Sequence, residues 1–235
     1  MNKNIPPKIF FEDPHLLVLS KPAGMLSQGD ESGDENLVDW LRQYLGRNYV
    51  GLVHRLDRNT SGIMVVAKRT KAAGRLTEAL QKGAIRRIYL AWLEGKLEKP
   101  QTWKHWLVKN SQTNEVRAVK AGHPEAKEAI LSVTPVEQCI FKEEPLTLAE
   151  FVLETGRSHQ IRVQSAAAGF PVVGDPKYGK PNRNLSSLFK RPALHSCRII
   201  FPHPMSQEIM SYEAELPQDF RQAAEVFQKV NKPHV

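Results

Sequence analysis

A polar loop that carries one acidic residue, between two apolar runs, constrains the fold of this chain most. The stretch Gly51–Gly62 reads GLVHRLDRNTSG, with the single carboxylate of Asp57 between Arg55 and Arg58. Apolar residues lead into the loop, and the apolar run 63–67 follows it. Short apolar runs bounded by polar turn residues are typical of buried strands. The pattern therefore predicts two buried strands that hold a polar loop rigidly, which is a suitable place for a reactive group.

Most of the other apolar segments predict strands. Apolar residues at helical spacing predict helices over 37–45, 70–82 and 158–169, with Asn36 and Ser158 as N-caps of the first and the third. A last helix is expected to start at Pro217. Because strand-like segments outnumber helices and are joined by short turns, we expect an α+β fold. Its core would be a largely antiparallel, mixed central sheet flanked by helices and loops.

The composition is that of a single globular domain. Hydrophobic residues make up 41% and charged residues 25% of the chain, and no repeat or composition break marks a linker. One domain is therefore expected over 1–235, with a core over about 9–217 and a C-terminal helix and tail over 217–235.

The chain is basic, with a formal net charge of +8 and an isoelectric point near 9.5. This charge favours a polyanionic partner, although a generic basic protein would carry it as well. Cys139 and Cys197 stand in no zinc-binding or disulfide pattern, which favours a reducing, cytoplasmic setting. No apolar run is long enough to predict a membrane span, and the polar N-terminus predicts no signal peptide.

A second notable stretch is Leu148–Arg162, LAEFVLETGRSHQIR, in which a strand is expected to turn into a helix. The free amides and dipole of a helix N-terminus are electropositive, and Arg157 and Arg162 add to that charge. If Arg162 contacts Asp57, its guanidinium would keep that carboxylate ionised, as a nucleophile or a base requires. The same residues also fit a structural Asp–Arg pair that ties a loop to a helix.

Other patterns of known chemistry are absent from the sequence. The histidines never fall at metal-ligand spacing, no GxSxG elbow is present, and Gly174–Gly179 (GDPKYG) lacks the pattern of a phosphate-binding loop. We therefore expect neither a metal nor a nucleotide cofactor. Tyr89 lies in an apolar strand, where it could be an aromatic core residue or a platform for base stacking.

Several segments together resemble the motifs of one enzyme family. HRLDRNTSG at 54–62, TGRSHQIR at 155–162 and GDPKYG at 174–179 resemble successive signature motifs of the RluA-type RNA pseudouridine synthases. DPHLLVLSKPAGML at 13–26 resembles that family's first motif, RRIYLAWLEG at 86–95 its tyrosine-bearing strand, and ALHSCRIIFPHP at 193–204 its closing strand. The segments follow one another in the family's order, so the resemblance covers most of the chain.

The resemblance implies an isomerase that converts uridine within RNA to pseudouridine. It makes Asp57 the catalytic aspartate, Tyr89 the aromatic residue stacked on the target uracil, and Arg162 the partner of Asp57. The reaction breaks the bond from N1 of the base to the ribose, turns the uracil and joins its C5 to C1′, without a metal, redox or nucleotide cofactor. An anionic carboxylate beneath the sugar would stabilise the positive charge that develops at C1′. Attack of Asp57 on C1′ and its action as a base on the sugar both stay open.

Three further residues are expected to bind the RNA. The target nucleotide must flip out of its stack, and Arg55 is expected to fill or brace the gap that it leaves. A dry pocket must hold the detached uracil. Ile161 and Leu194 are expected among the apolar walls of that pocket, together with Tyr89.

The expected partner is a stem-loop of ribosomal or transfer RNA, bound by a monomer through lysine and arginine contacts to phosphates. Many relatives carry an N-terminal S4-like RNA-binding module, whereas the first motif here begins almost at residue 1, so RNA choice is expected to come from loops of the catalytic domain. Gln164 stands where the family usually has a histidine. This difference leaves the assigned catalytic residues untouched.

Two other functions fit parts of the sequence. A non-catalytic RNA-binding or ribosome-assembly factor could use the same basic surface, but it would need no carboxylate facing RNA phosphates. A small-molecule glycosidase would need two cooperating carboxylates, and only Asp57 is a convincing candidate.

Overall fold

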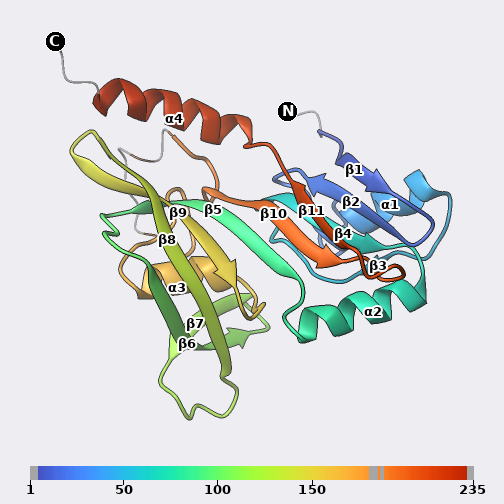
Figure 1. The fold of residues 1–235 in the computed structure, drawn as a ribbon. Helices are drawn as coiled ribbons and strands as arrows, with labels where there is room; N and C mark the ends of the chain where they lie inside the picture. The colour runs from blue at the N-terminus through green and yellow to red at the C-terminus, as the bar shows by residue number, and fades with distance from the viewer. Residues whose placement is uncertain (1–4, 180–184, 186–187, 232–235) are drawn as a thin grey trace. The chain divides into compact units, whose positions relative to one another are not determined.

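The chain forms two compact units, each with its own strands and helices (Figure 1). The computed structural model describes residues 5–179, 185 and 188–231. Unit 1 comprises the residues up to Arg87 together with Ser196–Glu215, and unit 2 comprises Ile88–His195 and the residues from Leu216. The strand pairs of described register are antiparallel, which confirms the predicted α+β fold with a mostly antiparallel sheet. The single domain expected from the sequence stays a prediction.

Unit 1 is built on four strands in the order β1-β2-β4-β10, with β3 paired to β4 and β11 paired to β10. Two helices belong to this unit, and most of β10 does. The bounds of these elements are β1 Lys8–Glu12, β2 Leu16–Lys21, α1 Leu37–Leu45, β3 Gly51–Leu52, β4 Ser61–Ala67, α2 Thr70–Gln81, β10 Leu194–Pro202 and β11 Ile209–Glu213.

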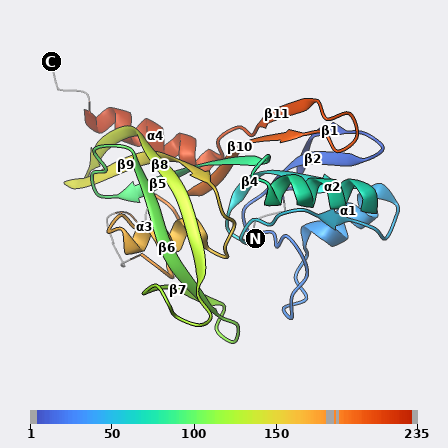
Figure 2. The same cartoon turned by 60° about the horizontal axis from the view of Figure 1, so that its bottom comes forward.

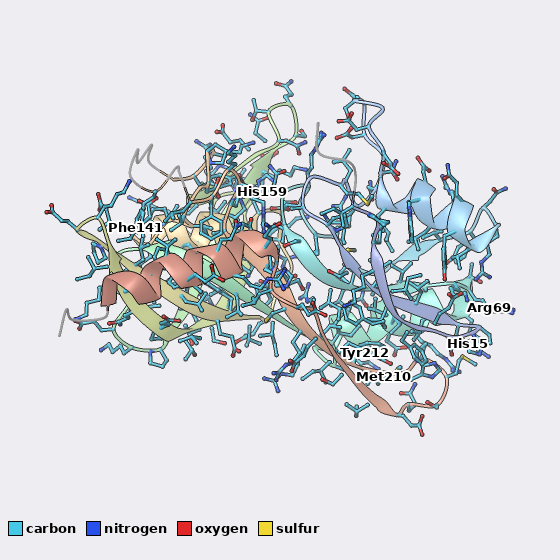
Figure 3. All side chains as sticks on the ribbon, turned by 90° about the horizontal axis from the view of Figure 1, so that it is seen from above. His15, Arg69, Phe141, His159, Met210 and Tyr212 are labelled. Carbon is cyan, nitrogen blue, oxygen red and sulfur yellow. The ribbon has the colours of Figure 1, made fainter. Side chains whose placement is uncertain are left out.

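The centre of unit 1 is β4, in which every residue is buried because β2 and β10 flank it and a helix covers it. Helix α2 lies alongside β4 (Figure 2), and Ala72 and Leu76 of the helix belong to the same buried cluster as Ile63 and Val65 of the strand. On β11, residues 210 and 212, labelled in Figure 3, pack against the same cluster. Burial of each large apolar side chain in such a cluster contributes roughly 1.5–3 kcal/mol, so β4 is a firm support for the loop that precedes it.

Helix α1 begins and ends where the sequence predicts. Asn36 is the N-cap, and its side chain accepts a hydrogen bond from the amide of Asp39. Gly46 ends the helix in the left-handed region at φ 61°. Its amide bonds to the carbonyl oxygens of the last turn, as glycine commonly does after a helix.

Unit 2 is built on five antiparallel strands in the order β5-β9-β8-β6-β7 with two helices. Strands β8 and β9 form a long hairpin, whose turn residues Lys142 and Glu143 both have positive φ, as the tightest hairpin turns require. The bounds of these elements are β5 Arg86–Glu94, β6 Gln101–Asn110, β7 Glu115–Val119, β8 Lys127–Phe141, β9 Glu144–Leu153, α3 Gln160–Ala167 and α4 Gln218–Asn231.

Two sequence predictions for unit 2 need correction. The helix expected over 158–169 spans only Gln160–Ala167, and its N-cap is His159 at φ 53° rather than Ser158. In the described part of the chain, no side chain caps this helix as the predicted Ser158 would have done; the side-chain oxygen of Gln160 instead accepts a hydrogen bond from the amide of Arg157, which precedes the helix. The expected terminal helix is α4, and the part of the predicted tail at 232–235 lies outside the described residues.

Candidate active site

Asp57 lies in the loop that joins β3 to β4 in unit 1. The two strands pair through Gly51 with Ala67 and Leu52 with Val66, so both ends of the loop are fixed. Within the loop, the amide of Thr60 donates to the carbonyl oxygen of Asp57 over 3.0 Å. This tight turn leaves the Asp57 side chain half-buried at the tip of a constrained segment.

A fully buried lysine ties the Asp57 loop to the segment after β2. Nζ of Lys21 donates to the carbonyl oxygens of Pro22, Met25 and Arg58 over 3.0, 2.7 and 3.2 Å. The amide of Gly24 donates to the same Arg58 oxygen over 2.8 Å. Hydrogen bonds from a charged donor are stronger than neutral ones, so this lysine holds the residue after Asp57 firmly.

The residue before Asp57 is fixed as well. Oγ of Ser27 donates to the carbonyl oxygen of Leu56 over 2.6 Å and accepts from its amide over 3.1 Å. Arg58 bonds to the carbonyl oxygen of Gly24 through Nε and to Asp34 through Nη1, over 3.1 and 2.7 Å. Hydrogen bonds therefore hold the backbone on both sides of Asp57 in place.

His54 anchors the start of the loop as a neutral side chain. Its Nε2 accepts a hydrogen bond from the amide of Val65 over 3.3 Å, so Nδ1 carries the proton. Burial, together with the charge of Arg87, lowers the pKa of His54 to about 3. Among the described residues, the buried Nδ1 of His54 and Nε of Arg87 have no hydrogen-bond partner. A positive charge on His54 would be costly here, so the anchor is neutral at neutral pH.

Gly62 allows β10 to approach the end of the loop. It has φ 120°, and a Cβ atom there would lie 2.1 Å from the carbonyl oxygen of Ser196. Oγ of Ser196 also donates to the carbonyl oxygen of Ile63 over 3.2 Å. Only glycine permits this backbone contact, which explains the glycine that closes the HRLDRNTSG motif.

The other predicted site residue of unit 1 is Arg55, which is exposed in the Asp57 loop. Its position in the loop is compatible with a contact to RNA. That role stays a prediction.

Four predicted site residues belong to unit 2. Tyr89 is 5% exposed on β5, where it pairs with Phe151 of β9. Ile161 and Arg162 are buried in α3, and Leu194 is buried at the start of β10. The predicted pairing of Arg162 with Asp57 would join the two units, and it stays a prediction.

Within unit 2, Arg162 forms a buried ion pair with Asp175. Its Nε and Nη2 donate to the two carboxylate oxygens over 2.7 and 2.8 Å. Asp175 also accepts from the amides of Lys177 and Tyr178 over 3.0 and 3.3 Å. The ring of Tyr178 lies 5.0 Å from Cζ of Arg162, within range of a cation–π contact. Arg162 is therefore held in one orientation by the GDPKYG segment.

Gln164, where the family resemblance predicts a histidine, fixes α3 to the strands beneath it. Its Nε2 lies 3.0 to 3.1 Å from the carbonyl oxygens of Trp103 and Ala129 and from Nδ1 of His105. These contacts join α3 to β6 and β8. The substitution is thus accommodated by hydrogen bonds in the interior of unit 2.

Sequence reasoning missed three side chains that support the site: Lys21, Ser27 and Asp175. Lys21 follows four buried apolar residues and Ser20, and a lysine at the end of such a buried strand is a signal for a buried cation with partners. For Ser27 and Asp175, the partners are distant in sequence, and local patterns do not identify them.

The described residues contain no group of three or more His, Cys, Asp and Glu side chains arranged to hold a metal ion. No helix within the described ranges is long and apolar enough to cross a membrane.

Comparisons with known proteins agree with the motifs. A model of the RNA pseudouridylate synthase family matches residues 15–167. The chain is 33% identical to the ribosomal large subunit pseudouridine synthase D of Nitrosomonas europaea, over 98% of this chain and 67% of that protein. It is 36% identical to the uncharacterized RNA pseudouridine synthase YhcT of Bacillus subtilis, over 91% of this chain and 70% of that protein.

A solved structure shows the same fold. Human RNA pseudouridylate synthase domain containing 1 superimposes with a TM-score of 0.75 over 100% of this chain and 99% of that chain, at 22% identity. The match to the family model covers more than half of the sequence, and the curated relatives match over most of it. The chain therefore belongs to the RluA-type RNA pseudouridine synthases, which are isomerases.

Proposed function

We propose that this chain converts specific uridines of structured RNA to pseudouridine with Asp57 as its catalytic carboxylate. The observation that carries the proposal is the support of the Asp57 loop. Lys21, Ser27 and the turn at Thr60 fix the backbone on both sides of a half-buried acid. A loop with no catalytic role would not need a buried ammonium group to hold its backbone, because burial of a charge is costly. A pre-positioned carboxylate, in contrast, lowers the reorganisation needed at the moment of reaction.

The proposed reaction starts with cleavage of the bond between N1 of the uracil and C1′ of the ribose. Positive charge develops at C1′, and Asp57 stabilises it either by attack on C1′ or as a base on the sugar. The uracil then turns, C5 bonds to C1′, the hydrogen on C5 leaves as a proton, and N1 takes up a proton. No atoms are gained or lost, so no cofactor is required.

Three residues act around Asp57 in this proposal. Tyr89 stacks on the target uracil, and Arg162 pairs with Asp57 and keeps it ionised. Arg55 braces the gap that the flipped nucleotide leaves. The buried Ile161 and Leu194 are apolar, as walls that exclude water from the detached base should be.

The proposed substrate is a stem-loop of ribosomal RNA. Curated relatives at 33 to 34% identity are named for the large ribosomal subunit, which favours this RNA over transfer RNA, the second candidate. The net charge of +8 supports binding to either RNA, because contacts to phosphates supply affinity without regard to sequence. We place the protein in the cytoplasm and expect it to act as a monomer.

The test uses the hydrogen that the reaction displaces. RNA carrying tritium at C5 of uridine should release label with the native chain and none with Asp57→Asn. Asp30→Asn, a change of an exposed carboxylate in the loop before α1, is the matched control and should release label as the native chain does. Equal release by Asp57→Asn would overturn the role of Asp57. If the native chain releases label from neither ribosomal nor transfer RNA, the binding-only function is favoured.

A further inference from the structure

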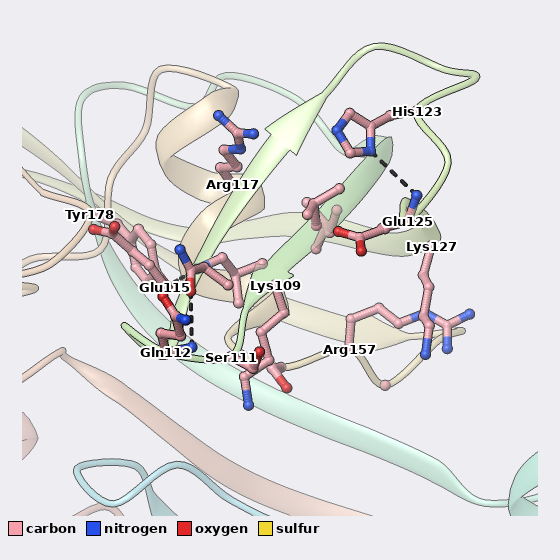
Figure 4. Close-up of a pocket in the computed structure, with 16 residues that line it drawn as sticks. Lys109, Ser111, Gln112, Glu115, Arg117, His123, Glu125, Lys127, Arg157 and Tyr178 are labelled. Atoms are coloured by element: carbon pink, nitrogen blue, oxygen red, sulfur yellow. Dashed lines mark hydrogen bonds between the residues drawn. The ribbon is translucent and has the colours of Figure 1, made fainter.

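A basic groove in unit 2 lies beside the segment that holds Arg162. It has a volume of about 1140 Å³ and is lined by the β6–β7 hairpin, the start of β8, residues 156–158 and Tyr178 (Figure 4). Small-molecule pockets have volumes of about 300–1000 Å³. The groove is larger and open, so an extended polymer fits it better than a single nucleotide does.

The charges in this groove favour an anion. Lys109, Arg117, Lys127 and Arg157 line it, and all four are exposed. None of the four forms an ion pair with a carboxylate of the described residues, although two glutamates also line the groove. Arg157 is oriented by one hydrogen bond, from its Nε to the carbonyl oxygen of Glu128 over 2.8 Å. Its remaining guanidinium nitrogens are available to a ligand.

Some exposed lysines elsewhere in the chain are neutralised by neighbours. Lys82 pairs with Glu78 over 2.6 Å, and Lys96 pairs with Glu98 over 3.0 Å. Unpaired cations concentrated on one concave surface are the electrostatic footprint of nucleic-acid binding.

Tyr178 connects the groove to Arg162. It lines the groove and packs on the apolar cluster of Leu107 and Val116 beneath it. Its hydroxyl accepts from the amide of Val116 over 3.1 Å and lies 2.6 Å from Nδ1 of His159. Its ring lies over the guanidinium of Arg162, and Asp175 binds both the amide of Tyr178 and that guanidinium. In Figure 4, Tyr178 lies on the side of the groove away from Lys127 and Arg157.

We propose that the groove binds a segment of RNA backbone and that Tyr178 links this binding to the orientation of Arg162. The identity of the ligand rests on the proposed function. Lys109, Arg117 and Lys127 contact phosphates, and Arg157 contacts a fourth. A ligand in the groove contacts Tyr178, and the ring of Tyr178, together with Asp175, keeps the guanidinium of Arg162 in place. Tyr178 is thus a positioning residue.

The first experiment measures binding alone, so its result does not depend on the role of Asp57. Total ribosomal RNA fragments are titrated with Asp57→Asn and with the same chain carrying Lys109→Gln, Arg117→Gln and Lys127→Gln. Each lost phosphate contact should lower the slope of log Kobs against log salt by about 0.7–0.9, so the triple variant should lose roughly two to three units of slope.

The matched control carries Lys71→Gln, Lys99→Gln and Lys142→Gln, three exposed lysines that do not line the groove. It changes the net charge equally and should keep the slope of the parent chain. Equal losses in the two triple variants would mean that overall charge, and not the groove, binds RNA, and would overturn the proposal.

The second experiment tests Tyr178 by tritium release at saturating RNA. Tyr178→Phe keeps the ring over Arg162 and should stay within about threefold of the native kcat. Tyr178→Leu removes the ring and should lower kcat at least about tenfold, with a smaller change in KM, because Arg162 acts in the reaction and not in RNA capture. Tyr178→Met replaces this variant if Tyr178→Leu does not fold. Equal kcat values for the Phe and the aliphatic variants, or a change in KM alone, would overturn the link to Arg162.

Discussion

Replacement of Gly62 by alanine should break the contact that closes the Asp57 loop. The new Cβ would lie 2.1 Å from the carbonyl oxygen and 2.6 Å from the amide nitrogen of Ser196. Nonbonded carbon contacts are optimal at about 3.5–4.0 Å, so β4 and β10 would have to separate by roughly 1.5 Å. Backbone strain at φ 120° costs about 1–3 kcal/mol, and forced overpacking of a core costs a similar amount. We therefore expect Gly62→Ala to lower the free energy of unfolding by about 2–6 kcal/mol.

Replacement of a glycine by alanine in α2 should have the opposite effect on stability. A Cβ at Gly74 would meet no atom within 4 Å, and this helical glycine has no positive φ. Gly74→Ala should therefore raise the free energy of unfolding by about 0.5–1 kcal/mol. Urea unfolding followed by circular dichroism gives both values. In tritium release, Gly62→Ala should also lower kcat at least about tenfold, because a shift of β4 moves Asp57. A loss below 1 kcal/mol in Gly62→Ala would refute the reasoning from the Ser196 contact.

Three further predictions follow from the site. Asp175→Asn keeps an acceptor for the backbone amides but removes the negative charge beside Arg162. It should lower the free energy of unfolding in urea by about 3 kcal/mol. A loss under about 1 kcal/mol would contradict a strong buried ion pair. Arg55→Ala should lower kcat/KM about tenfold on structured RNA. Because the residue is exposed, the free energy of unfolding should stay within about 0.5 kcal/mol of the native value. An unchanged kcat/KM would contradict a role of Arg55 in RNA binding. The pKa of His54 falls from 6.5 to about 3 on folding, so the unfolded chain takes up a proton as the pH drops below 6.5 and the folded chain does not. His54→Gln should therefore remove about 1.4 kcal/mol of the stability that the native chain loses between pH 7.5 and 5.5, and an unchanged loss in this variant would contradict a buried neutral His54.

Local patterns in the sequence predicted the elements whose stability is local. The spacing of apolar residues predicted the helix over 37–45, and the capping preferences of Asn36 and Gly46 predicted its ends. The apolar run after the Asp57 loop predicted the strand that is β4. These features depend on neighbours within a few residues, so a single sequence carries enough information for them.

Contacts between distant segments were not predictable in this way. The start of α3 was placed two residues early, because Ser158 does not cap the helix and His159 at its N-cap has a left-handed backbone that the local pattern does not indicate. The ion pair of Arg162 with Asp175 depends on the path of the chain between α3 and the GDPKYG segment. The family resemblance identified the motifs that matter, but it did not reveal which side chains hold them.

The close approach of Gly62 to Ser196 has a consequence for the order of folding. The two residues belong to unit 1, but all of Ile88–His195 lies between them in the sequence. A ribosome therefore completes this whole insertion before β10 emerges to cover β4. Until then, the strand that supports Asp57 has an open edge that can pair with other chains. The Asp57 loop of the nascent chain reaches its final form only after the last strands have been synthesised, so a truncation within β10 would leave the loop unsupported although Asp57 itself is present.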